Sequence, residues 1–329
     1  MIRFLDLHAQ YRLLKQEIDE AIAGVIEQSA FIGGDQLTAF EAEFASYQHA
    51  EHCVCVGNGT DAIEIILESL RLPTLSEVIV PANSFIATSE AVTRSGHKVV
   101  FADVDAQTQN LSVADVKRRI TPRTSAIIAV HLQGRPAPLA QLLELGIEHN
   151  LKIIEDAAQA HGAEIKGRRV GAIGAAGAFS FYPGKNLGAY GDGGAITTND
   201  ASLAKRCRMI ANHGRIGKYD HQFEGRNSRL DNLQAAVLLV KLRQLDNWIS
   251  QRNELANLYL QGLRGIPQLV LPAPTIDGRH SYHLFVIRCE QRDELAHYLA
   301  TQGIQTGIHY PTALPKLAAY AYLDQPSEE

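Results

Sequence analysis

The 329-residue sequence predicts an α/β fold: a mainly parallel seven-stranded sheet with helices on both faces, followed by a small α+β unit at the C-terminal end. Three observations indicate this class. Between residues 53 and 198, short β-branched runs alternate with stretches of helical periodicity. The runs are continuously apolar, which is typical of parallel strands covered on both faces. The length corresponds to roughly two domains of about 150 residues each.

Charge and composition exclude several classes of protein. The net charge is −5, from 31 basic and 36 acidic residues, so we expect no nucleic-acid partner. The first residues carry charges at positions 3 and 6, and no apolar signal-peptide core follows. The longest uncharged run, 170–184, is too short and too rich in Gly to span a bilayer. We therefore expect a cytoplasmic protein that does not contact a membrane.

The cysteine and histidine patterns predict no metal centre. The cysteines are too sparse for a disulfide framework and lack the spacing of zinc ligands. Cys53 and Cys55 alternate with valines and should share one face of a strand. The thirteen histidines form no HExxH-type cluster. We expect buried thiols at all four cysteines, which are Cys53, Cys55, Cys207 and Cys289.

The elements follow from periodicity and capping residues. Apolar residues at helical spacing predict a helix from Gln10 to Gln28, and Asp35 fits the N-cap of a second helix that ends near Tyr47. The expected strands are 53–56, 78–80, 99–101, 127–130, 151–154, 178–181 and 195–198. The expected helices among and after them are 60–70, 84–94, 112–120, 139–149 and 200–211.

The last third of the chain is less regular. Residues 212–229 show no periodicity and are long for a loop, which indicates either a function or disorder. A long helix is expected over 230–263, and prolines then mark a linker. A strand at 283–288, a helix at 292–302 and a strand at 304–308 complete the small unit. We assign residues 1–250 to a large domain and 251–329 to a small C-terminal domain.

Three segments carry candidate chemistry. Gly57-Asn58-Gly59-Thr60 follows a strand and opens a helix, which suits an anion site, although a tight turn explains it equally well. Asp156 ends a buried strand, where ligand sites of α/β sheets lie; the alternative is a helix N-cap. Lys185 stands between glycines in the least polar stretch of the chain, which favours a desolvated amine over an exposed loop tip. Together these parts match the needs of pyridoxal phosphate: an anion cup, an anionic partner for the ring nitrogen and a lysine.

The chain resembles the DegT/StrS-type nucleotide-sugar aminotransferases, which have the fold-type I pyridoxal-phosphate fold. The similar stretches reach from Phe4 to Pro311, nearly the whole chain. The most specific are Asn58-Gly-Thr-Asp-Ala62, Glu155-Asp-Ala-Ala-Gln-Ala-His-Gly162, Phe179 to Gly194, and Asn227-Ser-Arg-Leu-Asp231. The resemblance implies a cytoplasmic homodimer with active sites shared across its interface.

The resemblance also implies roles for individual residues. Lys185 is expected to form the internal aldimine with pyridoxal 5'-phosphate and to move the proton, and Asp156 to pair with the pyridine nitrogen. Gln159 is expected to bond the phenolic oxygen of the cofactor. Phe85 is expected to stack on the cofactor ring, with simple core packing as the alternative. The phosphate is expected to be held by Gly59, Thr60, Ser180 and, from the other subunit, Asn227.

The implied reaction is a transamination that passes through pyridoxamine phosphate. Glutamate is the usual donor in the family, and the acceptor is a keto-sugar attached to a nucleoside diphosphate. The segments around Lys185, Lys218 and Trp248 are most similar to the subgroup that aminates C3 of a dTDP-3-keto-6-deoxyhexose. Six residues are candidate substrate contacts, each with a structural or surface role as the alternative: Tyr182, Arg215, Lys218, Arg229, His309 and Tyr310.

The sequence departs from the family pattern in places, and the shortness of its C-terminal part keeps another function open. Gln133 stands where the family often has an aromatic residue, and members generally continue for several tens of residues beyond the segment around Tyr310, so we expect a shortened small domain. A catalytically silent or regulatory relative that binds the cofactor or a nucleotide sugar is one alternative, and amination at C4 is another. A lyase or dehydratase of the same fold is disfavoured, because such relatives replace the lysine.

Overall fold

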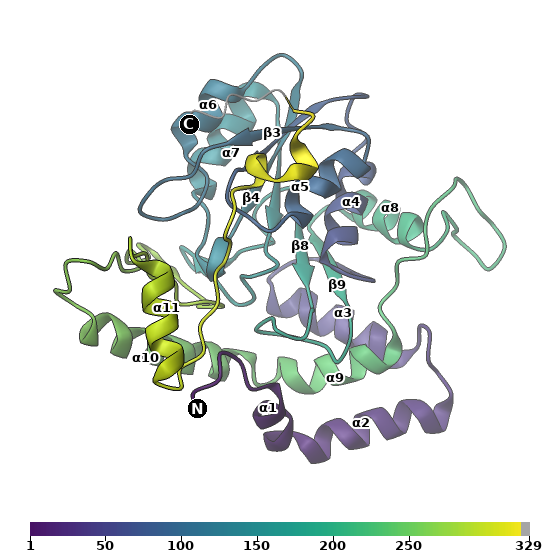
Figure 1. Cartoon of the computed structure of the whole chain (residues 1–329). Coiled ribbons are helices and arrows are strands. Elements are labelled where there is room, and N and C mark those ends of the chain that lie inside the picture. Colours follow the sequence, from purple (N-terminus) through teal and green to yellow (C-terminus); the bar gives the residue numbers. More distant parts are fainter. Residues whose placement is uncertain (324–329) are drawn as a thin grey trace.

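A computed structural model describes residues 1–323 and confirms the predicted fold class. The chain begins with three helices, of which the first two run along the base of the molecule in Figure 1 and the third lies higher, beneath the sheet. They are α1 (Leu7–Leu13), α2 (Lys15–Gln28) and α3 (Asp35–Tyr47). The single helix expected from Gln10 is wrong, because Leu14 leaves the helical conformation (φ −117°, ψ 14°) and is buried beside Val237 and Val240. Asp35 does not cap α3: Gly34, at φ 99°, holds that position.

Seven strands form one central sheet in the order β1-β9-β8-β5-β4-β2-β3. Only β9 runs antiparallel to its neighbours, so the sheet is mainly parallel, as predicted. Their bounds are β1 (His52–Val56), β2 (Glu77–Pro81), β3 (Lys98–Ala102), β4 (Thr124–Val130), β5 (Lys152–Asp156), β8 (Ala176–Ser180) and β9 (Gly194–Thr198). The carboxyl ends of β5 and β8, which carry Asp156 and Ser180, therefore lie side by side.

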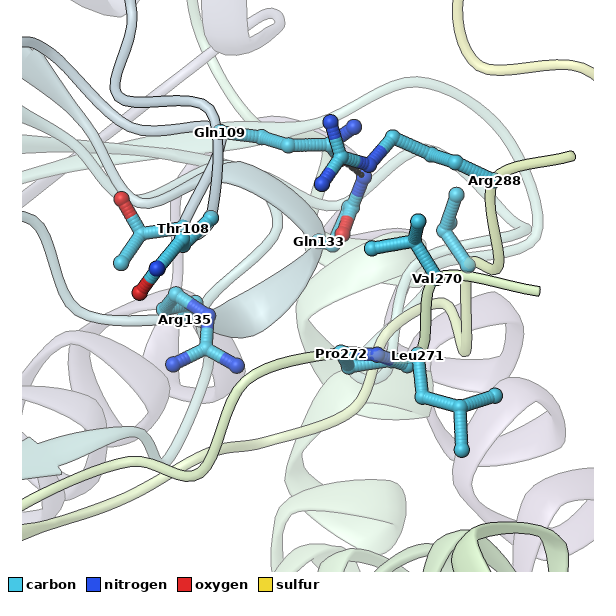
Figure 2. Close-up of a pocket in the computed structure, with 10 residues that line it drawn as sticks. Thr108, Gln109, Gln133, Arg135, Val270, Leu271, Pro272 and Arg288 are labelled. Carbon is cyan, nitrogen blue, oxygen red and sulfur yellow. Dashed lines mark hydrogen bonds between the residues drawn. The ribbon is translucent and has the colours of Figure 1, made fainter. Parts of the chain in front are cut away.

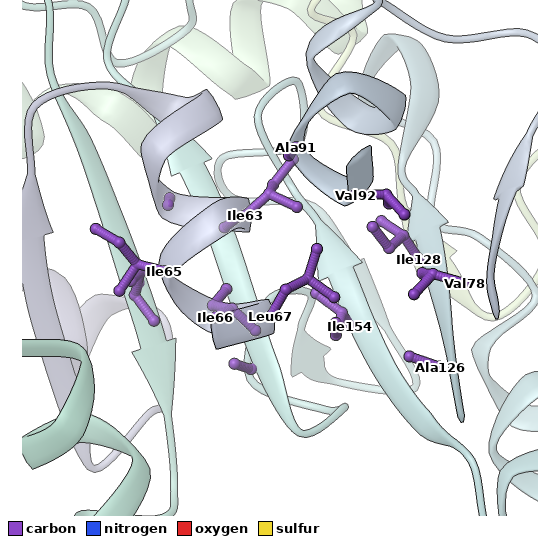
Figure 3. Close-up of a cluster of buried hydrophobic side chains, with 14 of the residues drawn as sticks. Ile63, Ile65, Ile66, Leu67, Val78, Ala91, Val92, Ala126, Ile128 and Ile154 are labelled. Carbon is purple, nitrogen blue, oxygen red and sulfur yellow. The ribbon is translucent and has the colours of Figure 1, made fainter. Parts of the chain in front are cut away.

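Helices cover both faces of the sheet. One face packs against α4 (Gly59–Ser69), α5 (Ala87–Arg94) and α8 (Ala201–Ala211). Figure 3 shows the part of this buried cluster that α4 and α5 form with the strands. The other packs against α3 and α9 (Asn232–Leu242) at one end and α6 (Val113–Arg119) and α7 (Leu139–His149) at the other. Strand residues alternate between the two layers: Ile154 joins the first and Ile153 the second. Cys53 and Cys55 share a face, as expected.

The aperiodic segment 212–229 is an excursion from the body of the protein, visible as the long loop beyond α8 in Figure 1. It is closed at its base by a bridge between Asn212 and Asn227 and further out by one between Arg215 and His221. The long helix expected over 230–263 is wrong in one respect. Arg243 and Gln244 separate α9 from α10 (Leu245–Gly262).

The C-terminal part contains α11 (Arg292–Thr301) and β10 (Gly278–Arg279), which joins β6 (Glu164–Ile165) and β7 (Arg168–Arg169) in a small sheet. The strands expected at 283–288 and 304–308 are wrong, since each makes only a single bridge. Instead, the N–H of Leu284 donates to the carbonyl of Gln133 in the short helix η1 (Leu132–Gly134), which uses a group that a strand would need.

The chain then returns to the large sheet through two short helices, η2 (Leu314–Lys316) and η3 (Ala318–Tyr320). The N–H of Leu314 donates to the carbonyl of Ala82 at 2.8 Å, and the hydroxyl of Tyr320 lies 2.6 Å from that of Ser89. No helix within residues 1–323 is long and apolar enough to cross a membrane.

Candidate active site

Lys185 lies on a tight loop that follows β8. The loop is closed by hydrogen bonds from the N–H of Lys185 to the carbonyl of Tyr182, and from that of Ala189 to Phe181, both 2.8 Å. A side chain at Gly188 would collide with the carbonyl of Pro183, so only glycine fits there. Burial lowers the pKa of Lys185, and the nearby charge of Asp156 opposes the shift. The structure thus gives this lysine the desolvated surroundings that the sequence predicts.

Asp156 is buried at the carboxyl end of β5, and no helix begins after it. Its Oδ2 accepts a hydrogen bond of 2.7 Å from the hydroxyl of Thr88, which lies 2.7 Å from that of Ser84. Its Oδ1 accepts from the N–H of Ala158 at 3.2 Å. The alternative of a helix N-cap is therefore wrong, and the carboxylate is held in place at the sheet edge. Sequence reasoning missed Thr88, although Ser84 and Thr88 stand four residues apart just after β2.

The adjacent carboxylate, Glu155, points to the other face of the sheet. Its oxygens accept hydrogen bonds from the N–H groups of Gly171, Ile173 and Gly174, and from His131 Nε2 at 3.0 Å. Burial raises the pKa of Glu155, but these donors outweigh it and hold the pKa below 4.5. All of its partners are structural, so Glu155 fixes the loop before β8 rather than facing the site.

Gln159 connects three segments. Its Oε1 accepts from the backbone N–H of Gln133 at 2.6 Å, which turns its amide NH2 toward Tyr310, whose hydroxyl accepts at 2.9 Å. The ring of Tyr310 lies 5.7 Å from that of Phe85, which is 54% exposed. Burial, together with the charge of Asp156, raises the pKa of Tyr310 to about 12. Five predicted residues thus converge: Lys185, Asp156, Gln159, Phe85 and Tyr310.

The side chain of Gln133, which departs from the family pattern, faces away from this group. It donates to Gln109 Oε1 at 2.7 Å. Figure 2 shows both glutamines on the wall of a neighbouring pocket that Arg135 and Arg288 also line. Only the backbone of Gln133 therefore reaches the candidate site.

A small cradle lies at the N-terminus of α4. Asn58 caps the helix by accepting from the N–H of Asp61 at 2.8 Å. Gly59 approaches β8 so closely that an added Cβ would stand 2.8 Å from that of Ser180. Within residues 1–323 the N–H groups of Gly59 and Thr60 have no hydrogen-bond partner, because they open the helix. The cradle fits a phosphate group, since these N–H groups, the helix dipole and the Ser180 hydroxyl meet there.

The remaining predicted residues are more scattered. Tyr182 is 59% exposed on the Lys185 loop. Arg215, Lys218 and Asn227 lie on the 212–229 excursion, where Arg215 donates to the carbonyl of Lys218 at 3.4 Å. Arg229, at its base, donates to Asn212 at 3.5 Å. In the single chain, no hydrogen bond within residues 1–323 joins these side chains to Lys185 or Asp156.

Three histidines surround Lys185, of which sequence reasoning singled out only His309. Burial and the charge of Lys185 lower the pKa of His309, whose ring stacks on Phe4 at 5.8 Å. The same two causes lower the pKa of His161 to about 3 and that of His283 well below 6.5. His161 packs among Phe44, Phe179 and Phe181. Neutral imidazoles thus line this side of the lysine.

Comparison with known proteins identifies the class. Residues 12–329 match the model of the DegT/DnrJ/EryC1/StrS aminotransferase family, and the chain belongs to this family. The predicted family, enzyme class and pyridoxal-phosphate cofactor are confirmed. Within residues 1–323 no group of three or more His, Cys, Asp or Glu side chains is placed to hold a metal ion.

Individual relatives are close. The chain is 47% identical over 320 residues to a dTDP-3-amino-3,4,6-trideoxy-alpha-D-glucose transaminase of Streptomyces venezuelae, covering 97% of this chain and 84% of the relative. It is 48% identical over 325 residues to the erythromycin biosynthesis sensory transduction protein EryC1 of Saccharopolyspora erythraea. This match covers 99% of this chain and 89% of the relative. The crystal structure of S. venezuelae DesV in complex with a ketimine intermediate superimposes with a TM-score of 0.98 at 46% identity, covering 100% and 88%.

Proposed function

We propose that the protein transfers an amino group from glutamate to C3 of a dTDP-linked 3-keto-6-deoxyhexose. The observation that carries this proposal is the convergence of Lys185, Asp156 and Gln159 beside the Gly59–Ser180 cradle. The similarity to the Streptomyces venezuelae transaminase, at 47% identity, supports the choice of substrate.

Each residue at the site has a role in this proposal. The cofactor supplies an electron sink that makes the amino-bearing carbon acidic. The Asp156 carboxylate, fixed by Thr88, holds a proton on the ring nitrogen, because a neighbouring anion favours the charged form. The NH2 of Gln159 donates to the phenolic oxygen of the cofactor. The N–H groups of Gly59 and Thr60 and the hydroxyl of Ser180 bind the phosphate, and Phe85 covers the ring.

Lys185 carries the cofactor between turnovers and moves the proton during the reaction. Its lowered pKa keeps a larger fraction of neutral amine than an exposed lysine would have, and only the neutral amine is a nucleophile or base. Tyr182, on the same loop, and His309 and Tyr310 are the proposed sugar contacts. His309 and Tyr310 belong to the C-terminal segment. In this proposal the C-terminal segment therefore completes the sugar-binding pocket.

The proposal includes a homodimer. Arg215, Lys218, Asn227 and Arg229 make no hydrogen bond to Lys185 or Asp156 of their own chain within residues 1–323. Across a dimer, Asn227 would reach the partner's phosphate cradle and the cations would offset the diphosphate charge. The excursion at 212–229, which is long and charged, then has a function.

A half-reaction tests the enzyme against a silent relative. The similarity to EryC1, named a sensory transduction protein, favours regulation as a second candidate. If the protein is a transaminase, glutamate added to the cofactor-loaded protein removes the absorbance of the lysine-bound cofactor and produces 2-oxoglutarate. An unchanged spectrum over hours, with the cofactor still bound, would favour the regulatory candidate.

A further inference from the structure

The loop that carries Lys185 rests on one face of α9. Lys241 and Gln234 are seven positions apart on this helix, about two turns, so their side chains point the same way. Nζ of Lys241 donates to the carbonyl of Gly188 at 2.6 Å. Oε1 of Gln234 accepts from the N–H of Tyr190 at 2.7 Å. α9 thus holds the loop just after Lys185.

Lys241 is an unusual residue in this position. Its side chain is 1% exposed, and its ammonium lies 4.2 Å from the centre of the Tyr190 ring. Within residues 1–323 it has no carboxylate partner. A buried ammonium without an anion is costly, whereas a neutral donor would satisfy the same carbonyl at lower cost. The charge therefore needs an explanation other than stability.

The carbonyl that Lys241 holds has little freedom. Gly188 packs against the carbonyl of Pro183, and the N–H of Ala189 donates to Phe181 at 2.8 Å. Asn186, one residue after Lys185, donates to the carbonyl of Ser281 at 3.0 Å. The position of Gly188 therefore sets how the loop presents the Lys185 amine.

We propose that Lys241 is a positioning residue for Lys185: its ammonium, seated on the Tyr190 ring, fixes the Gly188 carbonyl and so orients the reactive amine. The inference rests on the proposed function, because it takes Lys185 as the residue that reacts with pyridoxal phosphate. The bond is charge-assisted, so it weakens when Lys241 loses its proton.

Lys241 loses its proton within a pH range that can be reached in an experiment. Burial lowers the pKa of Lys241 to about 8. The nearest titratable group in residues 1–323 is Tyr190, whose ring lies 6.2 Å from that of Tyr11. Beyond Tyr11 lie Asp19, which accepts from its hydroxyl at 2.8 Å, Lys15, which is paired with Asp19, and His8, whose ring lies 6.4 Å from that of Tyr11. Burial raises the pKa of Tyr190 to about 12, and the hydrogen bond from Lys15 lowers that of Asp19. A titration near pH 8 at this place is therefore that of Lys241.

Cofactor capture tests the proposal. Apo protein is mixed with pyridoxal phosphate between about pH 6 and about pH 9, and the absorbance of the lysine-bound cofactor is followed for wild type, Lys241→Met and, as the matched control, the exposed Lys205→Met on α8. At neutral pH, Lys241→Met should capture the cofactor roughly tenfold more slowly than wild type, and Lys205→Met at the wild-type rate. The ratio of the wild-type rate to the Lys241→Met rate should fall as the pH rises through about 8, because the neutral amine holds the Gly188 carbonyl less strongly than the ammonium does.

A second variant covers the case in which Lys241→Met does not fold. Tyr190→Leu removes the ring beneath the ammonium but leaves the Gly188 carbonyl bonded, so a smaller loss with the same pH dependence is expected. A rate ratio that does not change with pH, or capture at the wild-type rate by both variants, would overturn the proposal. A wild-type protein that never forms the band would instead contradict the proposed function, and the inference with it.

Discussion

Asp156 depends on a residue 68 positions away in the chain. The hydroxyl of Thr88 donates to its Oδ2 at 2.7 Å in a buried setting, so this bond helps to keep the carboxylate aimed. Thr88→Val keeps the shape and removes the donor. We expect it to weaken cofactor binding roughly three- to tenfold, measured by equilibrium titration.

Thr93→Val is the matched control for this prediction. Thr93 lies on the same helix, α5, and its hydroxyl donates to the carbonyl of Glu90 at 3.0 Å, away from Asp156. The Thr93→Val variant should bind the cofactor as tightly as the wild-type protein does. Equal losses in both variants would show that the helix, rather than the contact with Asp156, accounts for the effect.

Lys185 itself gives the simplest prediction at this scale. Lys185→Ala removes the only group proposed to bond covalently to the cofactor, so the absorbance of the lysine-bound cofactor should be absent from the variant spectrum. Cofactor binding through the Gly59–Ser180 cradle should persist, detected by equilibrium dialysis. A lysine-bound band that survives the substitution would remove Lys185 from its role.

Sequence alone predicted the residues whose surroundings are local. The glycine-rich apolar segment around Lys185 predicts a desolvated amine, and the strand end predicts the place of Asp156. It did not find Thr88, His161 or Lys241. Each of these contacts its partner across the tertiary structure, and no short-range pattern records which side chains meet there.

At the scale of elements, Glu155 holds the loop between β7 and β8. Its carboxylate is fully buried and accepts hydrogen bonds from three backbone N–H groups and from Nε2 of His131. Glu155→Gln turns an NH2 group against these donors and leaves some of them unpaired. We expect a loss of about 3 kcal/mol in the free energy of unfolding, measured with urea. Glu148→Gln, at an exposed position on α7, should change it little.

The same residue predicts a dependence on pH. The folded-state pKa of Glu155 lies below its ordinary value of 4.5, so its contribution is complete above about pH 4.5 and is lost as the pH falls through the lowered pKa. The difference in unfolding free energy between wild type and Glu155→Gln should therefore shrink on acidification. A difference that stays constant from neutral pH into this acidic range would contradict the assignment.

Predicted elements failed where packing overrides periodicity. The apolar periodicity continues through Leu14 and past 243–244, yet one helix ends and another begins at both places. The expected strand at 283–288 instead docks on the turn at Gln133 and Gly134. By contrast, the helix expected at 139–149 matches α7, since its apolar periodicity ends at Asn150, which takes the left-handed conformation of a C-cap.

At the scale of the whole molecule, the proposed sharing of active sites can be tested by complementation. Lys185→Ala and Asn227→Ala are each expected to be impaired as homodimers. If Asn227 serves the partner's site, mixed dimers regain one intact site. Co-refolding equal amounts should then recover up to about a quarter of the wild-type activity per chain. If mixtures that are shown to contain mixed dimers recover no activity, the proposal is contradicted. Asn227 would then either serve the site of its own chain or lie outside the active site.

The division into domains at residue 250 stays a prediction. α10, from Leu245 to Gly262, runs across this position as one continuous helix. The chain spans 84% to 90% of the length of four curated relatives that are 44% to 48% identical to it. The segment 309–323 reaches both the site, through Tyr310, and the large sheet, through Tyr320.

The central claim is the transfer of an amino group to a nucleotide-linked keto-sugar. The most direct measurement incubates the cofactor-loaded protein with glutamate and either a dTDP-3-keto or a dTDP-4-keto 6-deoxyhexose, and identifies the products by mass spectrometry and NMR. We predict an amino group at C3, formed only from the 3-keto sugar and absent with Lys185→Ala. Amination only at C4, or no aminated sugar from a protein that holds its cofactor, would contradict the account.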